Sequence, residues 1–294
     1  MSTMRCFRHG VCAAAVLAML FTAWSALSAP FIEVRVRPSE PAANLLKNAD
    51  LAAHEGVQPV AWEFSSAETA NFEVGWSDDG HDGAGSLRLR TLTGAMSGYW
   101  GQHVAVTPGE TLMVQAWVRL TGGKLLLWLT GSPLQPDGSR GRFDQRYEAS
   151  SMKQFFLAPT WIRRDYLRGP DPERWFLVHK AMTIPDGMTD LSLKIGSYFA
   201  LGEMWLDDLY CGPARIDAAM TVRADPAGAA LRQVQVLAIP GPTVVFDSGA
   251  LGGAAEWTGQ AQGLDATLNL ILKVVTADGK YHVERLLPDP RGIR

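Results

Sequence analysis

The chain has little cysteine: three residues in 294, two of which, Cys6 and Cys12, lie within the first 28. If those 28 residues are removed, Cys211 is the one cysteine left, so the remaining chain cannot form an internal disulfide. Its fold must then be stabilised by burial of apolar side chains, and a chain of this length can form one or two hydrophobic cores. We expect Cys211 to be a buried, unreactive thiol.

Neither sign of charge dominates the sequence. The 27 Lys and Arg residues face 30 Asp and Glu residues, which gives a formal net charge of -3. This balance lacks the basic excess that is typical of nucleic-acid binding, so we expect no nucleic-acid partner. Hydrophobic residues make up 47% of the chain and charged residues 19%, which is the composition of a globular protein rather than a disordered one.

The short motifs that accompany common enzyme chemistries are also missing. The sequence has no nucleophile elbow, phosphate-binding loop or dinucleotide fingerprint, and His54-Glu55 is not followed by the second histidine of a zinc protease. Carboxylate pairs such as Asp207-Asp208 could serve glycoside hydrolysis, but acidic pairs near turns are common without catalysis. We predict a protein that is not an enzyme, with an enzyme acting on polysaccharide as the alternative.

Long apolar runs are confined to the first 28 residues. Arg5 and Arg8 precede an uncharged apolar segment over residues 11–23, and residues 26–28 provide small side chains suited to a cleavage site. This pattern is typical of a signal peptide over residues 1–28, with an uncleaved membrane anchor as the alternative. Because no second apolar span follows, we expect no membrane span after signal cleavage. The predicted location is periplasmic or extracellular.

Beyond residue 28, short runs alternate apolar and polar side chains and are separated by turns rich in Gly, Pro and Asp. This period of two predicts strands. The expected strands are 31–37, 86–92, 99–106, 111–120, 124–130, 176–184, 191–197, 204–210, 216–222, 231–239, 243–247, 268–276 and 281–287. Many short strands at this spacing are typical of an antiparallel β-sandwich or barrel.

The aromatic content changes after residue 213. Eight of the ten tryptophans lie in residues 29–213 and one lies in residues 214–294. We therefore predict a larger β domain over 29–213 and a small β-sandwich over 214–294. Residues 131–174 are rich in arginine and aromatic residues and are predicted to be a long inserted loop.

Alternation places polar and aromatic side chains on the outer face of three predicted strands, over residues 86–92, 111–120 and 191–197. Pyranose C–H bonds lie flat on aromatic rings, and amide and guanidinium groups pair with sugar hydroxyls. We predict a glycan site on this face; the alternative is an ordinary solvated sheet face on which the inserted loop covers the aromatic ring. The candidate ligand-binding residues are Trp117, Arg119, Gln115, Arg88, Arg90, Lys194 and, from the inserted loop, Trp161.

Several motifs occur in the order found in one family of binding modules. They are residues 44–51 (Asn-Leu-Leu-Lys-Asn-Ala-Asp-Leu), Pro59-Val60-Ala61-Trp62, Gly85-Ser86-Leu87-Arg88-Leu89, Trp100-Gly101-Gln102, Pro108-Gly109, Ala116-Trp117-Val118-Arg119, and residues 202–209 with Asp207-Asp208. This series resembles the cenC-like carbohydrate-binding modules of the family 4/9/22 type and covers about residues 44–212. Each motif is weak alone, and their order and spacing carry the resemblance.

The resemblance implies a galactose-binding-like jelly roll. The C-terminal part resembles Ig-like or fibronectin-like accessory domains, so we expect an all-β chain with a smaller β domain of that kind after the jelly roll. It also implies non-catalytic binding of a polysaccharide or oligosaccharide. The alternative is a structural or interaction protein of the cell envelope that binds a protein partner through the jelly roll and the 131–174 loop, since arginine and aromatic residues favour interface cores.

The same resemblance implies a structural calcium ion, for which Asn48, Asp50 and Asp207 are the candidate ligands. The sequence departs from the family pattern near this site. Ala49 replaces the usual glycine, and Ala52 stands where an acidic ligand is expected. The loss of one carboxylate should weaken calcium binding.

Overall fold

The structure is a computed structural model that describes residues 30–83, 85–150, 175–224 and 230–287. The predicted signal peptide, Trp161 and the rest of residues 151–174 lie outside these ranges. Export and the role of that part of the inserted loop therefore stay predictions.

Among the described residues, no helix has the length and apolar character that crossing a membrane requires.

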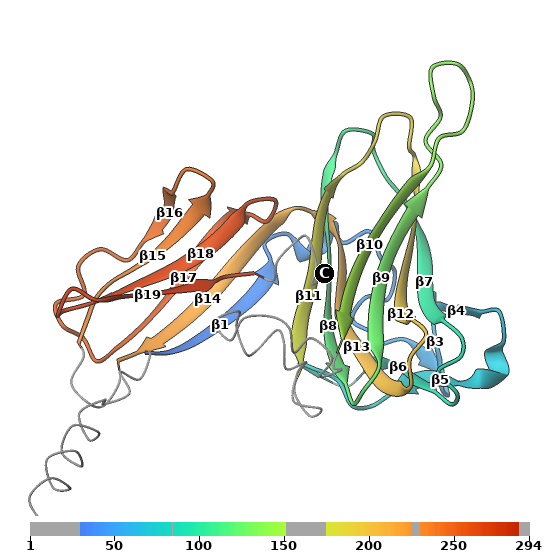
Figure 1. Ribbon diagram of the computed structural model, residues 1–294, viewed down its shortest axis with the longest axis horizontal. Helices are drawn as coiled ribbons and strands as arrows, with labels where there is room; N and C mark the ends of the chain where they lie inside the picture. The colour runs from blue at the N-terminus through green and yellow to red at the C-terminus, as the bar shows by residue number, and fades with distance from the viewer. Residues whose placement is uncertain (1–29, 84, 151–174, 225–229, 288–294) are drawn as a thin grey trace, which may run out of the picture.

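The described chain forms two β lobes that lie side by side (Figure 1). The strands of the larger lobe are β4 (Glu63–Ser66), β5 (Phe72–Ser77), β6 (Ser86–Thr91), β7 (Gly98–Ala105), β8 (Thr111–Leu120), β9 (Lys124–Gly131), β10 (Phe143–Ser150), β11 (Phe176–Thr183), β12 (Asp190–Ser197) and β13 (Gly202–Pro213). They form two antiparallel sheets. Sheet I has the order β10-β9-β12-β7-β4, and sheet II has the order β11-β8-β13-β6-β5.

Small elements complete the larger lobe: the two-residue strands β2 (His54–Glu55) and β3 (Gln58–Pro59), and the 3₁₀ turns η1 (Pro41–Ala43) and η2 (Thr69–Asn71).

The two sheets of the larger lobe enclose one hydrophobic core. On β9, Leu125, Leu127 and Leu129 point into it, and the strands of sheet II contribute their own alternate apolar residues. Trp62 and Trp100 are almost fully buried there, as is Cys211, whose burial raises the pKa of its thiol to about 12. This is the all-β jelly-roll sandwich that the sequence predicts.

Side-chain amides fix the segment that resembles the start of the family pattern. The Gln102 amide pairs with the backbone of Lys47, accepting its N–H at 3.1 Å and donating to its carbonyl at 2.8 Å. Asn44 donates to the Leu209 carbonyl at 2.8 Å and accepts the Cys211 N–H at 3.0 Å. These side chains provide hydrogen-bond partners for backbone groups of Lys47, Leu209 and Cys211. They thereby hold the segment around residues 44–47 against the sandwich.

The smaller lobe is also a two-sheet sandwich. Its strands are β1 (Phe31–Pro38), β14 (Arg215–Arg223), β15 (Leu231–Ile239), β16 (Thr243–Asp247), β17 (Glu256–Asp265), β18 (Asn269–Thr276) and β19 (Tyr281–Arg285). One sheet has the order β1-β14-β17 and the other the order β16-β15-β18-β19. The Ig-like or fibronectin-like topology of this lobe stays a prediction.

The predicted boundaries of the first domain need a correction at the N-terminal side. Strand β1 pairs with β14 along its whole length, with Val34 opposite Met220, and Val36 lies in the core of the smaller lobe. Residues 31–38 therefore belong to the smaller lobe and not to the jelly roll. Alternation identifies a strand, but its pairing partner here lies far along the chain, where no local pattern points to it.

The prediction of a loop over residues 131–174 was wrong for its first part. Residues 143–150 form β10, which pairs with β9 at the edge of sheet I. Phe143, Tyr147 and Ala149 are buried, while Asp144 and Arg146 alternate with them. The period of two was present in the sequence, but Gln145 interrupts the apolar row that Phe143, Tyr147 and Ala149 form.

Candidate functional site

The residues predicted to share one outer face lie on two different sheets. Arg88 and Arg90 on β6 and Trp117 and Arg119 on β8 lie on sheet II, whereas Lys194 on β12 lies on sheet I. Alternation correctly places Lys194 away from the core, between the buried Leu193 and Ile195. It says nothing about which sheet a strand joins.

On sheet II, the candidate side chains already bind one another. The Trp117 ring stacks on the His81 ring at 3.9 Å with an interplanar angle of 11°. The Arg119 guanidinium pairs with Asp79 and lies 4.1 Å from the centre of the Trp205 ring. These contacts take up the faces and donors that a sugar would need.

Charged neighbours on the same sheet are also paired. Arg88 donates to Glu203 at 2.6 Å, and Arg90 donates to Glu73 at 3.1 Å. Gln115 is only 2% exposed, close to Met113 and Tyr210, which belong to the hydrophobic core of the smaller lobe. Gln115 therefore cannot reach a glycan, because the end of the face on which it lies is covered.

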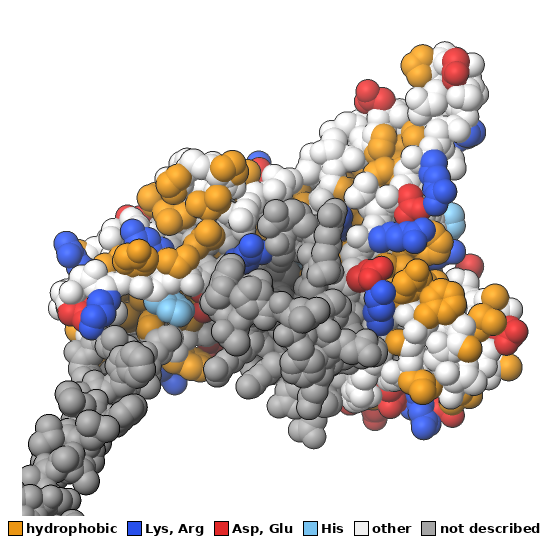
Figure 2. Space-filling model, in the orientation of Figure 1, with side chains coloured by type: hydrophobic (Ala, Val, Ile, Leu, Met, Phe, Trp, Pro, Cys, Tyr) orange, Lys and Arg blue, Asp and Glu red, His pale blue; other side chains and the backbone are white. Residues whose placement is uncertain are grey.

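A different group of side chains gathers on the outer face of sheet I. Trp128 on β9 is partly exposed and lies directly between Lys194 on β12 and Arg146 on β10 in the strand register. The Lys194 ammonium lies 5.6 Å from the centre of the Trp128 ring, and the Arg146 guanidinium lies 4.9 Å from it. Figure 2 shows basic and acidic side chains gathered over β9 and β10.

Asp144 organises this group. It accepts the Trp128 indole N–H at 3.0 Å, and it pairs with Arg146 at 3.0 Å and with Arg142 at 2.5 Å. The hydrogen bond from Arg146, followed by those from Arg142 and Trp128, lowers the pKa of the Asp144 carboxyl to about 2. Asp144 is therefore an anion at any ordinary pH, and it fixes the edge of the indole ring.

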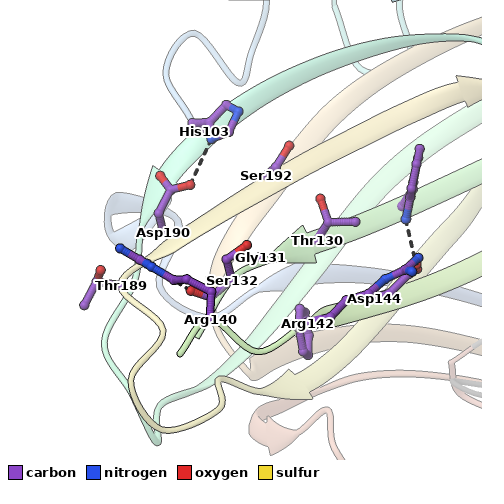
Figure 3. A pocket seen from close by; sticks show the side chains of 12 residues that line it. His103, Thr130, Gly131, Ser132, Arg140, Arg142, Asp144, Thr189, Asp190 and Ser192 are labelled. Atoms are coloured by element: carbon purple, nitrogen blue, oxygen red, sulfur yellow. Dashed lines mark hydrogen bonds and ion pairs between the residues drawn. The ribbon is translucent and has the colours of Figure 1, made fainter. Parts of the chain in front are cut away.

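A cavity of about 430 Å³ opens beside these residues. Figure 3 shows Thr130 and Ser192 on one side of the neighbouring strands β9 and β12, with His103 and Asp190 hydrogen bonded to each other nearby, 2.9 Å apart. The other lining residues are Trp128, Gly131, Ser132, Arg140, Arg142, Phe143, Asp144 and Thr189. The wall thus combines an aromatic ring, hydroxyl groups, carboxylates and guanidinium groups.

One side of the cavity comes from the hairpin that joins β9 to β10 and projects beyond the neighbouring strands (Figure 1). The Leu134 N–H donates to the Gly187 carbonyl at 2.9 Å, which ties this hairpin to the turn before β12. Arg140 donates to the Ser132 carbonyl at 3.1 Å and is otherwise exposed. In Figure 3 its guanidinium extends toward Thr189.

Sequence reasoning missed Trp128, Asp144 and Arg146. The signal for Trp128 was available: it is the aromatic residue among those in 124–130 that alternate with Leu125, Leu127 and Leu129. Asp144 and Arg146 lay in the segment that was predicted to be a loop.

The predicted calcium ligands Asn48, Asp50 and Asp207 form hydrogen bonds within the protein. Asn48 donates to the carbonyls of Ala53 and Val60, and its side-chain oxygen accepts the Ala53 N–H. Both Asp207 oxygens accept backbone N–H groups, from His81 and Asp208, and burial raises the pKa of this carboxyl to about 6. Asp50 is exposed and accepts the Ala52 N–H. The calcium stays a prediction, and nothing below depends on it.

Potential metal ligands also meet at His81, Asp82 and Asp208, with one ligand atom of each within 4.8 Å of the others. His81 and Asp208 are hydrogen bonded at 2.7 Å, and Asp82 pairs with Arg37 at 2.7 Å. These contacts explain the cluster without an ion.

No protein-family model matches this chain, and no curated protein is significantly similar to it. Among solved structures, the chain is similar to the enzymatically active domain of tailspike protein 4 of bacteriophage CBA120, with a TM-score of 0.43 and 14% identity over 58% of this chain and 22% of that one. It is also similar to a family 16 carbohydrate-binding module, with a TM-score of 0.37 and 16% identity over 57% of this chain and 99% of that one.

A third similar structure is the C-terminal family 22 carbohydrate-binding module of Clostridium thermocellum Xyn10B. Its TM-score is 0.36 and its identity 13%, over 59% of this chain and 96% of that one. TM-scores this low carry no argument about function, which has to rest on the chain's own residues.

Proposed function

We propose that this protein binds glycan, without catalysing its cleavage, on the outer face of sheet I. The observation that carries the proposal is Trp128: a partly exposed ring, held at its edge by Asp144 and flanked by Arg146 and Lys194, at the wall of a cavity of about 430 Å³. Aromatic surface combined with planar charged donors and hydroxyl groups suits the apolar faces and hydroxyl groups of sugars.

The proposal moves the predicted site from sheet II to sheet I. Of the predicted ligand-binding residues that the structure describes, the proposal keeps Lys194; Trp161 lies outside the described residues. Trp117 and Arg119 are assigned to packing instead, because His81, Asp79 and Trp205 occupy them.

A pair of tryptophan variants tests this assignment. Trp128→Ala and Trp117→Ala each remove one indole from an outer sheet face, but only the first removes part of the proposed site. On a glycan array, followed by calorimetric titration with a glycan that binds, we expect Trp128→Ala to weaken binding by about tenfold or more, the loss of one stacked ring. We expect Trp117→Ala to bind as the unaltered protein does.

The outcomes separate the site from the function. Equal loss in both variants, or loss only in Trp117→Ala, would contradict the site on sheet I. A chain that binds no glycan on the array would contradict the function itself. Release of reducing sugar from any polysaccharide would show that the protein is an enzyme.

A further inference from the structure

The charge around Trp128 is opposite in sign to that of the whole chain. The sequence carries a net charge of -3, yet four cationic side chains surround this part of sheet I: Arg140, Arg142, Arg146 and Lys194. Over the same surface, which is the cavity lining together with the charged neighbours of Trp128, the carboxylates are Asp144 and Asp190, and the nearby Glu148 is paired with Lys124. The surface is therefore locally basic on a protein that is acidic overall.

Two of these cations have no acidic partner among the described residues. Arg140 contacts the Ser132 carbonyl and Lys194 contacts the Trp128 ring, and no carboxylate of the described residues forms an ion pair with either. Arg142 and Arg146 share a single carboxylate, that of Asp144. This contrasts with sheet II, where Arg88, Arg90 and Arg119 each pair with an acidic side chain.

Asp144 also shows what these guanidinium groups can bind. It receives Arg146 through Nε at 3.0 Å and through Nη2 at 3.2 Å, the forked arrangement that favours a planar carboxylate. Arg140 lies at the cavity wall and donates from Nη1 to the Ser132 carbonyl, and no carboxylate of the described residues pairs with its remaining N–H donors. A ligand that brings its own carboxylate would supply the missing partner.

We infer that the glycan bound at this site is acidic and that its sugars carry carboxylates, as in chains of uronic acids. This inference rests on the proposed glycan binding and narrows it to one chemical class. The sugar ring packs against Trp128, and its carboxylate pairs with Arg140 or Lys194. The hydroxyl groups of Thr130 and Ser192, on adjacent strands in the same register row, face the same space.

The test compares ligands that differ only in charge. The full chain is titrated calorimetrically with oligosaccharides of galacturonate, mannuronate and glucuronate, and with the methyl esters of the same oligosaccharides. Esterification removes the negative charge and keeps the ring. We expect at least one uronate to bind about tenfold or more tightly than its ester, with an affinity that falls as salt is added, since salt screens exposed charges.

Three variants locate the effect. Arg140→Gln and Lys194→Gln should each reduce the preference for uronate over ester several-fold. Arg232→Gln is the matched control, because Arg232 is exposed on β15 in the other lobe, and it should leave the preference unchanged. Thermal unfolding of each variant checks that it is folded.

Equal affinity for uronates and their esters would overturn the inference while leaving glycan binding intact. Tighter binding of a sulfated oligosaccharide than of any uronate would overturn the inference that the site binds carboxylate groups. A loss of preference in Arg232→Gln equal to that in Arg140→Gln would place the effect outside this site. If no glycan binds at all, neutral or acidic, the proposed function fails first.

Discussion

At the scale of single residues, position on a strand does not decide whether a side chain is available. Trp117 and Trp128 both face away from the core of the larger lobe, and both could be identified by alternation. The His81 ring stacks on the first ring, whereas the second is held at its indole N–H by Asp144, approached by Arg146 and Lys194, and contacted edge-on by Tyr99. Tertiary partners, which have no local signature in the sequence, decide which of the two rings another ring covers.

The low pKa of Asp144 makes a prediction about stability at acid pH. A carboxyl whose pKa is about 2 in the folded protein, against about 3.9 in an unfolded chain, contributes stability that is present above the unfolded value and is lost as the pH falls through the folded value. We expect Asp144→Asn to lower the free energy of unfolding at pH 5, and we expect the gap to the unaltered protein to close as the pH approaches 2. Urea unfolding followed between pH 5 and pH 2 measures this gap.

Asp186→Asn serves as the control for that series. Asp186 is exposed on a turn and forms no ion pair with the described residues. A constant gap between Asp144→Asn and the unaltered protein over the whole pH range would contradict the prediction.

At the scale of elements, the hairpin between β9 and β10 depends on a glycine in another turn. Gly187 has a φ of +72°, and a Cβ there would lie 2.1 Å from the Leu134 carbonyl oxygen in the hairpin. The close approach puts Arg140 and Ser132 at the cavity wall. The position of these residues is therefore set by backbone packing between two loops.

Gly187→Ala should displace the hairpin. The added Cβ would clash with the backbone of Leu134. In addition, the left-handed backbone conformation at a residue with a Cβ lowers the stability of the folded protein by about 1–2 kcal/mol. We expect a lower unfolding temperature and weaker binding of whichever glycan the unaltered protein binds. Thermal unfolding and calorimetric titration measure the two effects.

Gly138→Ala separates the clash from the backbone cost. Gly138 lies in the same hairpin with a φ of +82°, and a Cβ there would meet no atom within 4 Å. We expect this variant to be destabilised only by its left-handed backbone conformation and to bind the glycan as tightly as the unaltered protein does. If both variants lose affinity equally, contact with the Gly187 turn does not position the site.

At the scale of the whole molecule, the two lobes share structure. Strand β1 precedes the jelly roll in the chain but completes a sheet of the smaller lobe. Met113 and Tyr210 lie on strands of the jelly roll and pack in the core of the smaller lobe. The lobes are therefore coupled in two ways: β1 pairs with a strand of the smaller lobe, and side chains of the jelly roll are buried in the core of that lobe.

Removal of residues 214–294 should destabilise the jelly roll that remains. It leaves β1 without β14 and exposes Met113 and Tyr210, and exposing two large buried side chains costs roughly 3–5 kcal/mol. Urea unfolding of the shortened chain should show a lower free energy of unfolding than that of the full chain. A chain shortened only by residues 288–294 is the control, and equal stability of the two shortened chains would contradict the coupling.

The sequence by itself determined the class of fold and most of its strands. The period of two predicted strands such as β8, β9 and β14 to within a few residues, because apolar and polar side chains alternate in a strand that has one buried face. It did not identify β4, β5, β10 or β17. In β10 the polar Gln145 interrupts the apolar row, and in β17 two glycines and few large apolar residues give a weak pattern. The burial of Cys211 followed from its type and its lack of a partner.

Only the tertiary structure decided which strands are neighbours, and with that the site. Lys194 was correctly predicted to face outward, but its neighbours Trp128 and Arg146 come from β9 and β10 and not from the strands first grouped with it. Side-chain periodicity is a property of one strand, whereas sheet order depends on pairing between segments far apart in the chain. For that reason the sequence could indicate surfaces suited to a sugar, and only the fold could show that the His81 ring stacks on Trp117 and that a cavity opens beside Trp128.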